Sequence, residues 1–61
     1  MAESGEHAVY FEFTAVGNAV KVTAIDSRTG VEVSAMGPAS AAQADLQKLA
    51  LQKLRQRLKR E

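Results

Sequence analysis

The sequence contains no cysteine, one histidine, one proline and three aromatic residues among its 61 positions. Without cysteine, disulfides and thiolate metal sites are excluded, and the lone His7 cannot form a histidine metal site by itself. A chain of this length buries only about 60% of its unfolded surface. Domains of this size usually rely on a disulfide, a metal or a partner chain for stability. The sequence therefore predicts oligomerisation.

Other missing features narrow the class of protein. No apolar run is long enough to cross a bilayer. The first seven residues, "MAESGEH", lack the positive region and apolar stretch of a signal peptide. We therefore expect a cytoplasmic protein without a membrane partner.

No catalytic constellation is present in the sequence. The serines at positions 27, 34 and 40 have only His7 as a candidate base, and the carboxylates are scattered. The glycines Gly17, Gly30 and Gly37 each fall at a predicted turn rather than in a phosphate-binding loop. The sequence predicts no enzyme, no cofactor, no metal site and no small-molecule substrate.

Two segments predict a tight β-hairpin. Residues "HAVYFEFTAV" alternate in hydropathy with period two, which is typical of a strand. Gly17 at the first central position suits a type II′ turn, after which "AVKVTAID" forms the second strand. With Val16 opposite Ala19, Phe13 faces Val22 and the apolar faces of both strands coincide.

A third strand continues the sheet. The segment "DSRTG" predicts a four-residue loop with Gly30 in a left-handed conformation. This loop pairs Asp26 with Val31 and sets Ala24 opposite Val33, so that apolar residues again share one face. Two turns that give consistent faces predict a three-stranded antiparallel β-meander.

A helix follows the sheet. Ser40 and Gln43 have the spacing of a capping box, and no glycine or proline follows Ala41. We expect a helix over residues 41–59, a flexible segment over 1–7 and one α+β domain over 8–61. In this βββα arrangement the helix packs on one sheet face. The predicted core contains Phe11, Phe13, Val22, Val33, Leu46 and Leu49.

The leucines of the helix exceed what a small sheet requires. At about 100° per residue, Leu51, Leu54 and Leu58 turn away from Leu46. Three short strands would span about 20 Å, so we expect the last helical turns to extend beyond the sheet. These leucines are therefore candidates for a homodimer seam, with pairing of the edge strand "AVYFEF" as the competing arrangement. On the outer sheet face, Tyr10 and Ile25 are further candidates for contact with a protein partner.

Charge is divided unevenly along the chain. Residues 1–43 carry two cations and five anions, whereas residues 44–61 carry six cations and two anions. A basic helix can bind phosphates, so a nucleic-acid-binding module is the alternative hypothesis. The helix dipole also favours cations near a C-terminus, which leaves the basic residues with a second explanation. The nucleic-acid candidates are Lys48, Lys53, Arg55, Arg57, Lys59 and Arg60.

The strand order is similar to the latter part of a double-stranded RNA-binding domain. That family places lysines at the start of its last helix, where this chain has Ala41, Ala42 and Asp45. The resemblance therefore implies the same order of strands and helix, and it does not imply a phosphate-binding site.

A second resemblance covers residues 9–54. The segments "VYFEFTAVGNAVKVTAIDSRTGVEVSAMGPAS" and "LQKLALQKL" together resemble a family of short, uncharacterised alphaproteobacterial proteins. Shared features are an aromatic strand, a Val-Gly turn, a "KVTAID" strand, a "TG.EV" hairpin, a "GP" break and a leucine helix. The resemblance implies a bacterial cytoplasmic origin and brings no site residues. The leading hypothesis is a small non-enzymatic structural or protein-interaction module.

Overall fold

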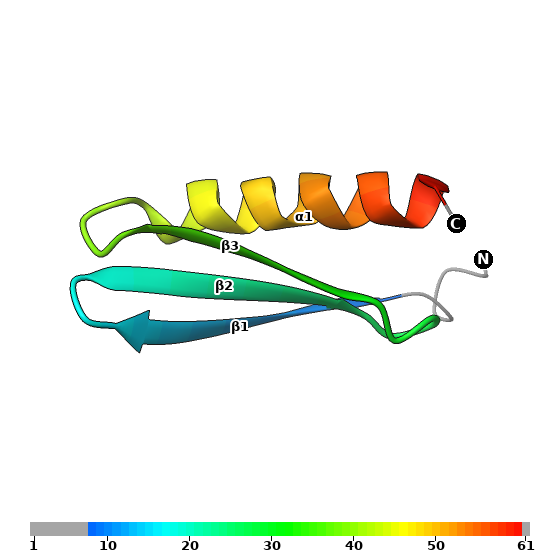
Figure 1. Cartoon of the computed structure of the whole chain (residues 1–61), viewed down its shortest axis with the longest axis horizontal. Helices are drawn as coiled ribbons and strands as arrows, with labels where there is room; N and C mark the ends of the chain where they lie inside the picture. Colours follow the sequence, from blue (N-terminus) through cyan, green and yellow to red (C-terminus); the bar gives the residue numbers. More distant parts are fainter. Residues whose placement is uncertain (1–7, 61) are drawn as a thin grey trace.

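The computed structural model describes residues 8–60 and contains one three-stranded sheet with one helix on a single face (Figure 1). The elements are β1 (Val9–Val16), β2 (Ala19–Asp26), β3 (Glu32–Pro38) and α1 (Gln43–Arg60). The strands lie in the order β1-β2-β3 and all pairs are antiparallel. The predicted α+β meander followed by a helix is confirmed. The segment 1–7, with His7, and residue Glu61 lie outside the described residues.

The register of the first hairpin agrees with the prediction. Val16 pairs with Ala19, and Phe13 pairs with Val22. Gly17 has a φ of 60°, whereas no described residue other than glycine has a positive φ. A positive φ at the first central position alone is the signature of the type II′ turn. Its twist matches that of the flanking strands, so a two-residue loop closes the hairpin without splaying them.

The second hairpin also has the predicted register, and a buried carboxylate holds its loop. Ala24 pairs with Val33, and Gly30 has the expected positive φ of 78°. The Asp26 side chain is 1% exposed and its Oδ2 accepts hydrogen bonds from the Thr29 N–H at 2.9 Å and the Thr29 hydroxyl at 2.7 Å. A buried carboxylate requires such donors, so the loop is specified by Asp26 and Thr29 together.

The connection between β3 and α1 differs from the prediction. Gly37 lies within β3 and not in a turn. A Cβ at this position would lie 2.5 Å from Leu46 Cδ2, so glycine lets the helix approach the strand closely. The predicted capping box is wrong, because α1 begins at Gln43 and the Ala42 carbonyl accepts its first hydrogen bonds. Ser40 lies in the preceding turn, which the bond from the Ala41 N–H to the Pro38 carbonyl closes.

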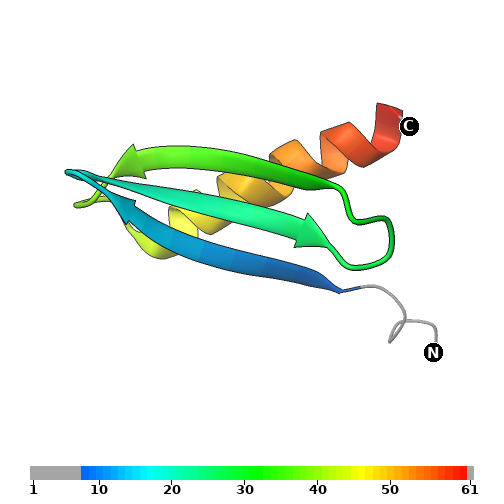
Figure 2. The same ribbon diagram turned by 60° about the horizontal axis from the view of Figure 1, so that its bottom comes forward.

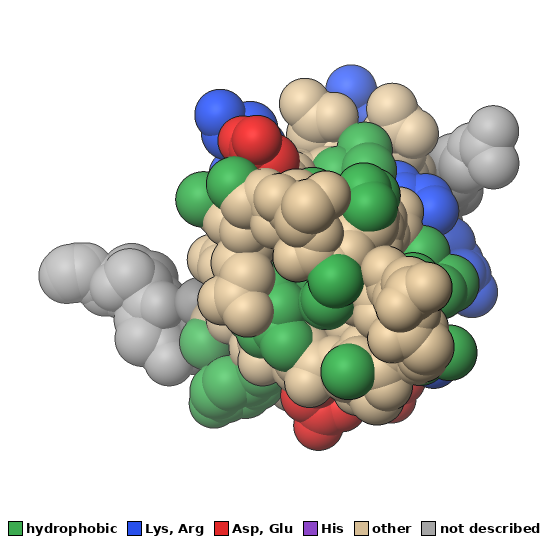
Figure 3. All heavy atoms as spheres, turned by 90° about the vertical axis from the view of Figure 1, so that its left-hand side faces the viewer, with side chains coloured by type: hydrophobic (Ala, Val, Ile, Leu, Met, Phe, Trp, Pro, Cys, Tyr) green, Lys and Arg blue, Asp and Glu red, His purple; other side chains and the backbone are tan. Residues whose placement is uncertain are grey.

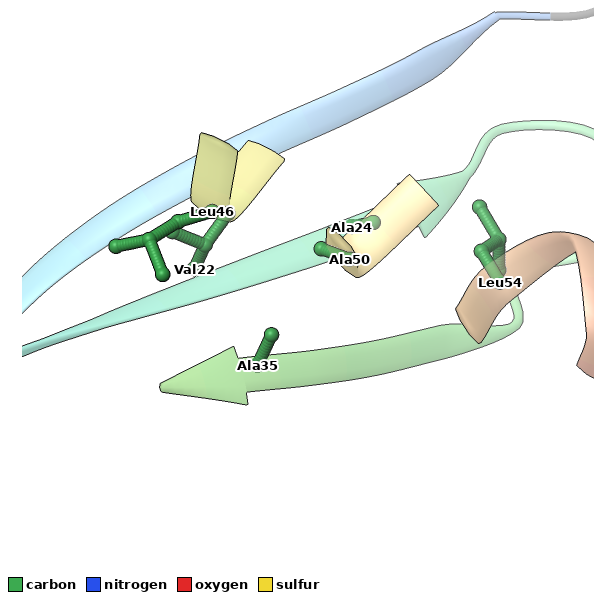
Figure 4. Close-up of a cluster of buried hydrophobic side chains, with 6 residues drawn as sticks. All are labelled: Val22, Ala24, Ala35, Leu46, Ala50 and Leu54. Atoms are coloured by element: carbon green, nitrogen blue, oxygen red, sulfur yellow. The ribbon is translucent and has the colours of Figure 1, made fainter. Parts of the chain in front are cut away.

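Helix α1 crosses the sheet obliquely. In Figure 2 its first turns lie behind β1 and β2, and its later turns pass behind β3 and emerge beyond that strand. The contacting side chains Leu46, Ala50 and Leu54 follow a four-residue ridge (Figure 4), and such ridges are inclined to the helix axis. Alanines at positions 24, 35 and 50 allow the close approach of helix and sheet in this core.

The expected overhang along the strands is wrong. Strands of eight residues span about 26 Å, and a helix of 18 residues is about 27 Å long. Sheet and helix are therefore about equal in length, so the last turns of α1 extend past the sheet sideways, beyond β3, rather than past the strand ends (Figure 2). Leu54 is fully buried, and Leu58 is half-buried against the core.

The core lies over two strands rather than three. Helix α1 packs on β2 and β3, and the buried apolar residues are Val22, Ala24, Ala35, Leu46, Ala50 and Leu54. Phe13 and Leu49, both predicted for the core, are 37% and 44% exposed. Helix α1 packs on β2 and β3 more than on β1, and the Phe13 side chain on β1 stays partly exposed. Phe11 is half-buried and packs against the core.

Candidate interaction surface

The three candidate leucines of the helix do not form a common exposed face. Leu54 is fully buried beneath the sheet, so the structure contradicts its assignment to a seam. Leu58 packs against the core from the last turns of α1, and Leu51 is half-buried. The exposed leucine among the described residues of α1 is instead Leu49, which is 44% exposed. Of the three candidate leucines, Leu51 and Leu58 keep part of their surface exposed.

Tyr10 and Ile25 lie side by side on the sheet face opposite the helix. The two residues are paired across β1 and β2. Tyr10 is 59% exposed and Ile25 is half-buried. Their neighbours on this face include Glu12, Thr23 and Glu32, so the apolar area is small and interrupted by polar side chains. This pair alone does not define a binding surface.

The outer edge of β3 is protected against pairing with another strand. Asp26 N–H donates to the Val31 carbonyl at 2.9 Å, which places the odd residues of β3 in bonds to β2 and directs the even ones outward. Among these, the Ser34 carbonyl accepts a hydrogen bond from Lys53 Nζ at 2.8 Å. Pro38 has no N–H to donate. A covering lysine and an edge proline are common protections of an edge strand.

The outer edge of β1 has no such protection within the described residues. Ser27 N–H donates to the Ala8 carbonyl at 2.9 Å, so the even residues of β1 bond to β2 and the odd residues direct their N–H and C=O groups outward. This edge is eight residues long. It presents the backbone groups of Val9, Phe11, Phe13 and Ala15.

The side chains of these same four residues lie on the helix side of the sheet. They pair with residues of β2 that include the buried Val22 and Ala24. None of the four is charged, although an inward-pointing charge is a usual defence of an edge strand. The Phe13 ring is 37% exposed, on the strand that α1 contacts less than β2 and β3. The edge therefore combines unused backbone groups with uncovered apolar area.

The sequence predicts this edge strand as the competing dimer seam, but it also predicts Phe13 as a core residue. The available signal was the contrast between the two edge strands. Residues 9–16 contain no proline or lysine, whereas the third strand ends in Gly37 and Pro38. The covering bond from Lys53 depends on where the helix crosses the sheet, and no local pattern shows that.

Two of the basic residues of α1 interact with other groups of the molecule. Lys53 is bonded to Ser34, and Arg57 also has an interaction partner. Lys48, Arg55 and Lys59 are exposed and lie on one side of α1, over about 16 Å of helix. On the molecular face shown in Figure 3, Lys and Arg side chains lie at the margin and form no continuous patch. The side chain of Arg60 lies outside the described residues.

Within residues 8–60, no group of three or more His, Cys, Asp or Glu side chains could hold a metal ion. A surface hollow of about 460 Å³ is lined by Arg55, Gln56, Leu58 and Lys59. All four of these described lining residues come from α1. No described helix is long and apolar enough to span a membrane.

The fold defines the class of protein as a small α+β module with one helix on a three-stranded meander. Residues 6–61 match the family described as Domain of unknown function (DUF6898), and the chain belongs to this family. No curated protein matches the chain, and no solved structure does.

Proposed function

We propose that the chain is a small non-enzymatic protein-interaction module and that it self-associates through the edge strand β1. The observation that carries the proposal is the asymmetry of the two sheet edges. The β3 edge is blocked by Lys53 and Pro38, whereas the β1 edge presents backbone groups and the exposed Phe13 ring. An exposed edge strand is a template for another strand.

A second copy of the chain is the occupant that fits this edge. The copy presents the same eight residues, so each exposed Phe13 meets an equally apolar edge, as a two-fold interface requires. A domain with six buried apolar side chains has a small core, and pairing adds apolar burial that the monomer lacks. Support for the helix seam is weaker, because Leu54 is buried in the core and Leu58 is partly buried against it.

The experiment is a comparison of two lysine substitutions on adjacent residues of β1. Phe13→Lys places a charge on the helix side of the edge, and Thr14→Lys places the same charge on the outer face. Light scattering behind a sizing column should give a dimer for the parent and for Thr14→Lys, and a monomer for Phe13→Lys. A parent that is monomeric at high micromolar concentration would contradict the proposal.

A third variant guards against loss of folding. Ala15→Pro removes an outward N–H that β2 does not use, so the sheet keeps its internal bonds. We expect it to be monomeric with a far-ultraviolet circular dichroism spectrum like that of the parent. An Ala15→Pro variant that remains a dimer would exclude the β1 edge as the seam.

The alternative function, nucleic-acid binding, is favoured by the exposed basic residues of α1, of which Lys48, Arg55 and Lys59 lie on one side of the helix. No aromatic side chain lies among them for base stacking, so we rank it second. Alphaproteobacterial origin and cytoplasmic location stay predictions from the sequence.

A further inference from the structure

We infer that two copies of the chain pair antiparallel about a two-fold axis that passes through Phe13, so that each Phe13 lies opposite its counterpart. The inference rests on the proposed self-association of β1 and specifies the geometry of that interface. Strand alternation, aromatic exposure and charge each bear on the choice of register.

Strand alternation limits the registers to a few. Residues directly opposite in an antiparallel pair point to the same face. The outward backbone groups belong to the odd residues of β1, so odd residues must meet odd residues. A two-fold axis perpendicular to the sheet then passes through Phe11, Glu12 or Phe13 if most of the strand is to pair. In each case both α1 helices lie on the same face of a continuous sheet with three strands from each copy.

Charge excludes the register centred on Glu12. That register sets Glu12 of one copy directly against Glu12 of the other, and like charges in opposite positions are destabilising. The register centred on Phe13 sets Glu12 opposite Thr14 of the second copy. Thr14 is itself paired with Lys21, so Glu12 and the lysine of the second copy share one row on the outer face. The two-fold axis creates this arrangement twice.

Apolar complementarity separates the remaining two registers. In the register centred on Phe11, Ala15 and Val16 lie beyond the paired residues. Val16 is 49% exposed, and this register would leave it uncovered. Centred on Phe13, residues 10–16 of both copies are all paired, with Tyr10 opposite Val16 and Phe11 opposite Ala15. The two partly exposed Phe13 rings meet at the axis, and aromatic pairs stabilise such cross-strand positions. Phe11, Phe13 and Ala15 supply about six inter-strand hydrogen bonds.

The test uses single cysteines, since the parent sequence has none. Even residues of β1 lie on the outer sheet face in pairs that do not share hydrogen bonds across the seam. Such pairs have Cα atoms about 4.5 Å apart, which suits a disulfide. Glu12 is kept in every variant, because its charge contributes to the choice of register.

Three mixtures report on the three registers. The variants are mixed under reducing conditions, then oxidised, and mixed disulfides are measured by mass spectrometry. The mixture of Tyr10→Cys with Val16→Cys reports the register centred on Phe13, and we expect at least a tenfold excess of disulfide here over the other mixtures. Tyr10→Cys with Thr14→Cys reports the register centred on Glu12. Ala8→Cys with Thr14→Cys reports the register centred on Phe11.

Each outcome decides the inference. Preferential disulfide formation in either of the last two mixtures would overturn the register and leave self-association through β1 intact. A dimeric parent without disulfide in any mixture would overturn the pairing geometry. A parent that is monomeric by light scattering would overturn both this inference and the proposed function, so the two failures are distinguishable.

Discussion

Replacement of Leu54 by alanine should remove most of the stability of the domain. Leu54 has no exposed surface and is among the largest fully buried side chains of the described residues. Leucine-to-alanine substitutions at buried sites cost about 2.7–5 kcal/mol, because apolar burial is lost and a cavity remains. At about 0.05–0.15 kcal/mol per residue, a domain of this length is stable by about 3–9 kcal/mol. The loss is therefore comparable with the whole free energy of unfolding.

Leu49→Ala is the matched control on the same helix. Leu49 is 44% exposed, so alanine removes about half of the burial worth roughly 1.5–3 kcal/mol for a leucine. We expect a loss of about 1 kcal/mol, which for a small domain lowers the melting temperature by about 4–8 °C.

Thermal unfolding followed by circular dichroism at 222 nm measures both effects. All variants must be compared at one protein concentration, because self-association makes the melting temperature depend on concentration. We expect Leu49→Ala to melt cooperatively below the parent and Leu54→Ala to show no cooperative transition above room temperature. If Leu54→Ala melts at or above the temperature of Leu49→Ala, the assigned core is wrong.

The remaining predictions concern the loop, the helix and nucleic acid. Thr29→Val removes the hydroxyl that donates to buried Asp26 and should lower the free energy of unfolding by about 1–3 kcal/mol in urea titrations; Thr14→Val, on the exposed outer face, should change it little. Leu51→Glu should leave the dimer intact by light scattering, and a monomer would restore the helix seam. Fluorescence polarisation should show no sub-micromolar binding to duplex DNA at ~150 mM salt. Tight binding that is lost when Lys48, Arg55 and Lys59 become glutamine would reverse the ranking of the two proposed functions.

The strand registers were predictable because their causes are local. Period-two alternation fixes which side chains share a face, and the turn residues Gly17 and Gly30 fix the loop conformations. Each hairpin therefore follows from two strands that are neighbours in the sequence and from the turn between them. The spacing of Asp26 and Thr29 in "DSRTG" was also a usable signal, because Asp side chains commonly bond the backbone of the turn that follows.

The position of the helix on the sheet was not predictable in the same way. Whether Phe13 or Leu54 is covered depends on the crossing angle and on the relative lengths of helix and strands. The angle arises from contacts between residues distant in sequence, such as the close approach of Leu46 to Gly37. The strands are longer than expected, which is why Leu54 and Leu58 were predicted at the surface. Phe13 was predicted for the core because strand alternation places it on the helix side, and alternation does not show how much of that side the helix covers.

The unprotected edge of β1 follows from the same crossing. Since α1 packs mainly on β2 and β3, Lys53 reaches the Ser34 carbonyl on the β3 edge, whereas the β1 edge belongs to the strand that the helix contacts less than the other two. The candidate interface is therefore a consequence of tertiary packing and not of a sequence motif.

Amide hydrogen exchange along β1 tests the pairing of this edge most directly. In a monomer, the amides of the even residues bond to β2 and exchange slowly, whereas those of Phe11, Phe13 and Ala15 point outward and exchange rapidly. We predict that the three outward amides become protected as the protein concentration rises through the dimerisation range, with little change at the even residues. Rapid exchange of these three amides at concentrations where light scattering reports a dimer would contradict the account.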